Sequence, residues 1–267
     1  MYSKSRVFRG LCRSVTLLLG GLSVLTLSGC SVNDGDSDSA SDAYVSAINS
    51  DARSRDDKRT DNRRASVDVL RFTGVKAGDT VVDLLGGEGF YSELLAHVVG
   101  SDGVVYLQNT SLFLNFSGKG LEARLKNGRL SNVIRLDSDF ADLQLPEDVD
   151  VIFIGLAYHD IYVPREDPVL MTSRDEFFPQ IWDSLRPGGH LVIVDHAARP
   201  GSGTDDTASL HRIGEQYAIE DFERAGFELV DELDVLRNAK DDYSKDIWDK
   251  SVYRKTDRFI LRFRKPN

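Results

Sequence analysis

Three side chains that can bind or release a proton stand together at Tyr158, His159 and Asp160. They directly follow an apolar stretch, residues 149–155, which predicts a buried strand. Histidine titrates closest to neutral pH, so we expect His159 to act as a general base, with Asp160 orienting its ring and Tyr158 lining the reacting centre. A histidine that only caps a loop after a strand is the alternative interpretation.

Two further histidines follow a later apolar stretch and a long Gly/Ser/Thr/Asp loop. Imidazole and carboxylate groups are suitable metal ligands, although their spacing here matches no metal-binding motif. The sequence leaves open both a metal site and a set of independent polar loop residues, whereas His97 and His190 are expected to be structural. The groups concerned are His159, Asp160, Asp195, His196 and His211.

A glycine-rich turn follows the apolar residues 81–82 and Asp83. Near-continuous apolar sequence is typical of a parallel strand that is covered on both faces. Gly86, Gly87 and Gly89 permit positive φ angles, and a helix from about Phe90 directs its positive N-terminal end to the same place. Residues 79–99 therefore predict a strand, a nucleotide-type binding turn and a helix.

The turn does not fit the dinucleotide fingerprint GxGxxG, because the sixth position counted from Gly87 is Ser92. This disfavours a nicotinamide cofactor. An acid at a strand end followed by GxG instead resembles the first motif, (D/E)xGxGxG, of class I S-adenosylmethionine (SAM)-dependent methyltransferases. Asp83, Gly87 and Gly89 match that motif, whereas Leu85 stands at its first glycine.

The resemblance implies SAM as the cofactor and gives roles to further residues. Asn109 stands where the family has an acid that binds both ribose hydroxyls, and a neutral amide makes weaker hydrogen bonds there. Asp139 and Phe140 would contact the adenine amino group and ring; alternatively they are a helix N-cap and a core aromatic. Tyr158 would face the sulfonium. The expected cofactor-binding residues are Asp83, Leu85, Gly86, Gly87, Gly89, Asn109, Asp139 and Phe140.

The elements that must position these residues alternate between strands and helices, which predicts an α/β fold with right-handed crossovers. We expect a doubly wound, mostly parallel, seven-stranded Rossmann-like methyltransferase sheet, with helices between its first five strands. The resemblance, carried also by LRPGG at 185–189 and AIEDFERAGFELV at 218–230, covers about residues 60–267 and implies an antiparallel last strand. The predicted strands are 81–83, 104–107, 133–136, 149–155, 190–195, 227–233 and 258–264.

The N-terminus has the pattern of an export signal, with four basic residues before an apolar segment at 15–27. LSGC at 27–30 resembles the lipobox of bacterial lipoproteins, in which Cys30 is lipidated. We therefore expect a signal peptide at 1–30, a Ser/Asp-rich tether at 31–50 and the folded domain at 51–267. An ordinary signal peptide or a single membrane anchor is the alternative. The prediction places the protein in the cell envelope on the periplasmic side, and Ser31 is compatible with the outer membrane.

The chain is acidic, and removal of the leader makes it more so. Of 33 Lys and Arg residues, Lys4, Arg6, Arg9 and Arg13 precede Cys30, so 29 remain against 43 Asp and Glu, a formal charge of about −14. Such a surface repels nucleic acid and anionic membrane, so we expect neither as a substrate. Both cysteines, Cys12 and Cys30, lie in the leader, which excludes cysteine catalysis in the domain.

Two main functions follow from these observations. The first is a SAM-dependent methyltransferase that acts, as a monomer, on a small molecule or an envelope component. The second is a methyltransferase fold that has lost catalysis and serves as an envelope ligand-binding module, which the residues Leu85 and Asn109 favour. A metal-dependent hydrolase built at the same strand ends is a third.

Overall fold

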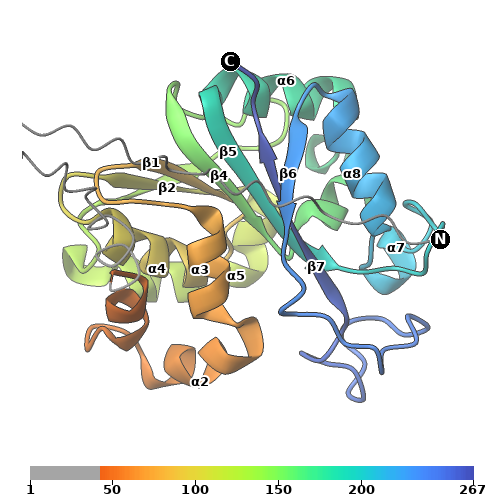
Figure 1. Cartoon of the computed structure of the whole chain (residues 1–267), viewed down its shortest axis with the longest axis horizontal. Coiled ribbons are helices and arrows are strands. Elements are labelled where there is room, and N and C mark those ends of the chain that lie inside the picture. Colours follow the sequence, from red (N-terminus) through yellow and green to blue (C-terminus); the bar gives the residue numbers. More distant parts are fainter. Residues whose placement is uncertain (1–42) are drawn as a thin grey trace, which may run out of the picture. The chain divides into compact units, whose positions relative to one another are not determined.

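The computed structural model describes residues 43–267, which form a seven-stranded sheet in the order β3-β2-β1-β4-β5-β7-β6 (Figure 1). Strands β1 to β5 pair in parallel, and β7 is antiparallel to both β5 and β6. The predicted fold class is therefore confirmed. The strands are β1 (Thr80–Leu84), β2 (Val104–Asn109), β3 (Val133–Asp137), β4 (Val149–Gly155), β5 (Leu185–His196), β6 (Glu228–Glu232) and β7 (Arg258–Arg264).

Helices cover both faces of the sheet, so the central strands are apolar on both sides. Val81 shares an apolar cluster with Leu94 of α4, whereas the next residue, Val82, shares the opposite cluster with Phe177 of α6 and Phe222 of α8. This alternation follows from the two-residue period of a strand. The α-helices are α2 (Arg55–Arg64), α3 (Ser66–Thr73), α4 (Phe90–Val99), α5 (Ser111–Leu125), α6 (Arg174–Ser184), α7 (Thr207–Leu210) and α8 (Glu215–Arg224).

The helix boundaries have local causes. Gly89, at φ 80°, precedes α4, and the side chains of Ser54 and Thr110 cap α2 and α5 by accepting backbone N–H bonds. Ser173 and Glu176 form a reciprocal capping box at the start of α6. Three short 3₁₀ helices complete the set: η1 (Lys126–Gly128), η2 (Tyr158–Tyr162) and η3 (Pro168–Leu170).

Two expectations about the chain's organisation need revision. A helix was expected between each pair of the first five strands, but residues 138–148, between β3 and β4, contain none. Side-chain hydrogen bonds hold this short connection instead; for example, the Leu143 backbone N–H donates to the side-chain oxygen of Gln180. Residues 43–49 are helical, and the Tyr44 hydroxyl donates to the Val75 carbonyl at 2.9 Å. Folded structure thus begins within the segment 31–50 that the sequence analysis assigned to a tether.

The predictions for the signal peptide, for Cys30 and for the first part of the tether lie outside the described residues. Within residues 43–267, no helix combines the length and the apolar content that a bilayer crossing requires.

Candidate active site

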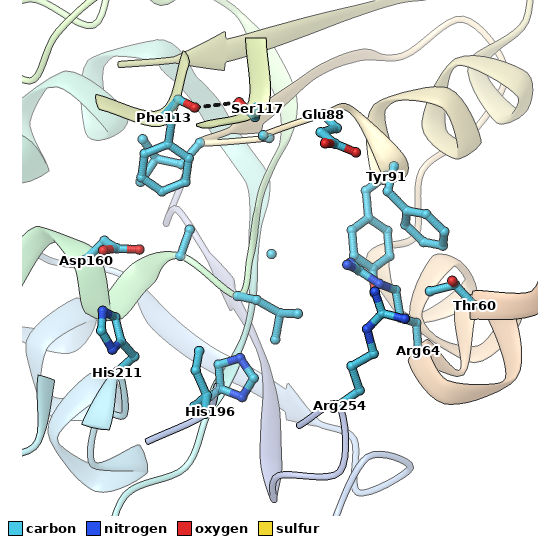
Figure 2. Close-up of a pocket in the computed structure, with 18 of the residues that line it drawn as sticks. Thr60, Arg64, Glu88, Tyr91, Phe113, Ser117, Asp160, His196, His211 and Arg254 are labelled. Atoms are coloured by element: carbon cyan, nitrogen blue, oxygen red, sulfur yellow. Dashed lines mark hydrogen bonds between the residues drawn. The ribbon is translucent and has the colours of Figure 1, made fainter. Parts of the chain in front are cut away.

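A cavity of about 1030 Å³ lies at the carboxyl ends of β1, β4 and β5, the edge at which parallel α/β sheets bind ligands (Figure 2). Gly86 and Gly87 of the turn line one part of it, and His159 and His196 line another. Helices α2 and α5 and the segment 247–258 close the remaining sides. Residues far apart in the sequence therefore face one space.

His159 is held in this cavity by the buried carboxylate of Asp195, at the end of β5. The His159 Nδ1–H donates to Asp195 Oδ1 at 2.8 Å, and the His159 backbone N–H donates to Oδ2 at 2.7 Å. Asp160 was the expected orienting group, but its Oδ2 lies 3.6 Å from His159 Nε2, beyond hydrogen-bond distance, and it pairs with Arg165. Asp195 therefore orients the imidazole, and Nε2 is the nitrogen left without a hydrogen bond within residues 43–267.

The pKa values of the two neighbouring histidines are driven apart. Burial opposes the charged form of His159, but the Asp195 carboxylate outweighs it and raises the pKa of His159 above its ordinary value. Burial lowers the pKa of His196 well below its ordinary value, and the nearby His159 acts in the same direction. Their ring centroids are 6.1 Å apart. His159 is thus suited to accept a proton, while His196 stays neutral.

His211 joins the same cavity, with its ring centroid 5.8 Å from that of His159. The Nδ1 atoms of His196 and His211 lie 2.7 Å from the Thr256 hydroxyl and 3.2 Å from Asp246 Oδ2. Across the described range 43–267, no group of three His, Cys, Asp or Glu side chains is arranged to hold a metal ion.

Tyr158 points away from the cavity, although it is adjacent to His159 in sequence. It is fully buried, and its hydroxyl donates to Asp221 on α8. Its ring centroid lies 4.9 Å from that of Phe222. The ring expected beside the reacting centre therefore belongs to the core between the sheet and α8.

The glycine turn is tightly built around Asp83. This carboxylate is buried and accepts the Ser92 hydroxyl, and burial raises its pKa to about 6. A Cβ atom on Gly86 would lie 2.8 Å from Asp83 Oδ2, so only glycine fits there. Leu85 takes a left-handed conformation, φ 56°, at the position where the motif has its first glycine. The leucine thus keeps the turn's shape at the cost of backbone strain.

Residues at the end of β2 form hydrogen bonds with the backbone of this turn. The Gly86 N–H donates to the Gln108 carbonyl at 3.0 Å, and the Gly87 N–H donates to Asn109 Oδ1 at 2.8 Å. The Asn109 amide returns a bond to the Gly87 carbonyl at 3.0 Å. Asn109 is fully buried and does not line the cavity. Its amide braces the turn rather than facing the space where a ribose was expected.

Asp139 and Phe140 also lie outside the cavity lining. Asp139 accepts the backbone N–H and hydroxyl of Ser111, at 2.9 and 2.8 Å, at the start of α5. Phe140 is a core residue, with its ring 6.3 Å from that of Phe177. Asp139 makes these bonds from a loop and is not itself a helix N-cap, whereas Phe140 is a core aromatic as in the second interpretation.

Several lining residues had no role in the sequence analysis. Phe113 and Phe116 of α5 supply aromatic surface, and Phe116 is 68% exposed. The signal for them was a helix directly after β2 with aromatic residues three positions apart. Asp195 could have been found as an acid at the end of the strand next to β4, but it was considered only as a metal ligand.

This sheet order, with its antiparallel β7 and its glycine turn after β1, defines the fold of the class I SAM-dependent methyltransferases. A SAM-dependent methyltransferase from Aquifex aeolicus superposes with a TM-score of 0.53 at 21% identity, covering 74% of this chain and 88% of that one. The [4+2]-cyclase SpnF gives a TM-score of 0.53 at 18% identity, covering 76% and 80%.

Among curated proteins, the chain is similar to ubiquinone/menaquinone biosynthesis C-methyltransferases UbiE. It is 26% identical to that of Methylococcus capsulatus over 134 residues, 50% of this chain and 48% of the relative. It is 28% identical to that of Vibrio parahaemolyticus over 150 residues, 53% of each. The chain thus spans about half the length of these relatives. No family model matches the sequence.

Proposed function

We propose that this protein is a SAM-dependent methyltransferase that acts on a small molecule or an envelope component. One observation carries the proposal: a single cavity joins the Asp83–Gly89 turn to a histidine that a buried carboxylate orients. The similarity to UbiE methyltransferases and the shared fold support it.

The cavity has room for the cofactor beside the turn. A Cβ atom on Gly87 would meet no protein atom within 4 Å, so this glycine borders open space within the lining. Gly86, Gly87 and the apolar surface of Leu85 and Phe113 would hold SAM, which supplies an electrophilic methyl group on sulfur when it is bound. The residues of the turn therefore fit the cofactor by shape.

The protein's own contribution to the reaction would be alignment and proton removal. His159 Nε2 would take a proton from the methyl acceptor, and Asp195 would stabilise the imidazolium that results.

Calorimetric titration of the full-length protein with SAM and with S-adenosylhomocysteine tests this proposal, and micromolar affinity, about −8 kcal/mol, is expected. Gly87→Arg should abolish binding because its side chain projects into the cofactor space. Gly78→Arg is the matched control: its φ of 86° is equally positive, its Cβ also meets nothing within 4 Å, and it does not line the cavity. Equal affinity in both variants would refute the assignment.

A second candidate is a ligand-binding module that has abandoned methyl transfer. The specific observation in its favour is Asn109, whose side chain is bonded to Gly87 on both sides and offers nothing to a ribose. A neighbour named as a [4+2]-cyclase also has this fold. The absence of any heat or thermal shift with millimolar SAM would select this candidate.

We also propose that the protein is exported and lipid-anchored in the cell envelope, on the periplasmic side, with residues 1–30 as its signal peptide. The basic leader, the apolar segment and LSGC at 27–30 support this location. Cys30→Ala should leave the protein without a lipid when cells are labelled with a radioactive fatty acid. Normal labelling of that variant would contradict the proposal.

A further inference from the structure

Four arginines line one wall of the cavity and form no ion pair with any carboxylate within residues 43–267. We call this set the arginine wall; it consists of Arg63, Arg64, Arg254 and Arg258. Other arginines of the same cavity are neutralised, since Arg124 pairs with Asp57 and Arg165 with Asp160, each at 2.8 Å. Figure 2 shows Arg64 and Arg254 on the side of the cavity next to Tyr91.

Arg258 is the most constrained member of this wall. It is only 8% exposed, its Nη2 donates to the Arg63 carbonyl at 2.9 Å, and its Nε has no partner among the described residues. Burial lowers the pKa of Arg258, and the charge of Arg64 acts in the same direction, whereas Tyr91 and Asp257 partly oppose the shift. A buried guanidinium with an unused donor and a like charge nearby is unfavourable unless an anion joins it.

Arg64 lines the cavity beside the start of α4. Its guanidinium carbon is 4.4 Å from the ring centroid of Phe90, the first residue of α4 after the glycine turn. Its positive charge lowers the pKa of Asp83 on the turn side and of His196 on the histidine side, each time as a smaller contribution beside burial. An anion bound here would lie beside the first residue of α4, next to the glycine turn.

We propose that Arg64 and Arg258 form an anion subsite that binds a carboxylate or phosphate group of a ligand in this cavity. Guanidinium groups bind such groups with two parallel, charge-assisted bonds, and both Arg64 and Arg258 line the cavity. The anionic group could belong to the amino-acid end of SAM or to the methyl acceptor. Only this choice between two sources rests on the proposed function.

The first experiment titrates the full-length protein with inorganic phosphate at constant ionic strength, with chloride as the reference salt. Arg64→Met and Arg258→Met should each weaken phosphate binding about ten-fold or more. Arg55→Met is the matched control, because it removes the same charge from an exposed position on α2 outside the cavity. Thermal unfolding establishes that each variant is folded, and methionine keeps much of the apolar side-chain volume at each position.

The second experiment identifies the source of the anion by comparing SAM with decarboxylated SAM. If the subsite binds the cofactor's carboxylate, the natural protein prefers SAM about ten-fold, and both variants lose that preference. If it binds the acceptor, the two compounds bind alike, and phosphate still binds when S-adenosylhomocysteine is saturating. Phosphate binding that is absent, or equal in all three variants, together with no preference between the compounds, would overturn the subsite.

The two proposals fail separately in this design. Phosphate binding that depends on Arg64 and Arg258, without any SAM binding, would keep the anion subsite and reject the methyltransferase. SAM binding, with neither phosphate binding nor the preference for SAM depending on Arg64 or Arg258, would keep the methyltransferase and reject the anion subsite.

Discussion

Asp195 and Asp221 are both fully buried carboxylates, and they bind two residues that are adjacent in sequence, His159 and Tyr158. The surroundings of the two carboxylates differ. Asp221 accepts bonds from Tyr158, Tyr162, Arg174 and Arg224, all of them within the packing of η2, α6 and α8. Asp195 accepts two backbone N–H groups and one imidazole, and that imidazole borders the cavity.

The two networks therefore differ in what they can do. Burial and the Asp221 carboxylate raise the pKa of Tyr158 well above its ordinary value, so this phenol keeps its proton at every physiological pH. The pKa of His159 is raised above its ordinary value by the neighbouring Asp195 carboxylate, and its side chain lines a cavity that can hold a ligand. Burial and polar partners are common to both, so access to the cavity is the feature that separates a candidate site from a structural network.

The largest effect is expected when His159, the residue of the Asp195 network that lines the cavity, is replaced. His159→Gln should lower kcat by about 10²- to 10⁴-fold, because the base is lost, while SAM affinity stays within about two-fold. Steady-state methyl transfer, once an acceptor is found, and calorimetry measure the two quantities. A normal kcat in this variant would place proton removal elsewhere.

Asp195→Asn should have the next largest effect, a fall in kcat of about 10²-fold, the lower end of what a positioned general base contributes. The rate of the natural protein should rise as pH increases through the raised pKa of His159, because only neutral imidazole accepts a proton. Without the carboxylate that pKa falls, so the rise should move to lower pH. A pH–rate profile of Asp195→Asn tests whether the rise in rate moves to lower pH. An unchanged profile would contradict the proposal that Asp195 raises the pKa of His159.

The same pair predicts a pH dependence of stability. Because the folded pKa of His159 is raised, its stabilising contribution is complete below the unfolded value of about 6.5 and is lost as pH rises through the folded value. The difference in unfolding free energy between the natural protein and Asp195→Asn should therefore be larger at acid pH than at alkaline pH, as measured by denaturant titration. A difference that does not change with pH would contradict this linkage.

The smallest effect is expected in the Asp221 network. Tyr158→Phe removes one of several donors to Asp221 and should reduce the unfolding free energy by about 1 kcal/mol, with kcat unchanged. Thermal unfolding should show a decrease of about 2–4 °C in Tm. A large loss of methyl transfer without a loss of stability would return Tyr158 to the active site.

The fold could be predicted because its signals are local. Near-continuous apolar runs, the glycine turn and the crossover helices each depend on neighbouring residues, and the predicted bounds of β4 and β7 match those observed. The connection at 138–148 was harder, because its conformation depends on Gln180, a residue on α6 far along the chain.

The site was predicted only in part, because side-chain direction is decided by packing. His159 does line the cavity, but its carboxylate partner comes from β5 and not from the next residue in sequence. Tyr158 and Asn109 occupy expected positions in the chain, yet each turns toward a protein partner. Adjacent positions in a 3₁₀ helix point in different directions, so a cluster in sequence need not be a cluster in space.

The bond from Arg258 to the Arg63 carbonyl joins positions 195 residues apart, and the cavity is lined by residues from Asp56 to Arg258. A chain still emerging from a ribosome lacks β7 and hence Arg258. The pocket therefore cannot be completed before β7 has been synthesised. Truncation of the final strand should remove ligand binding even if the first four parallel strands still assemble.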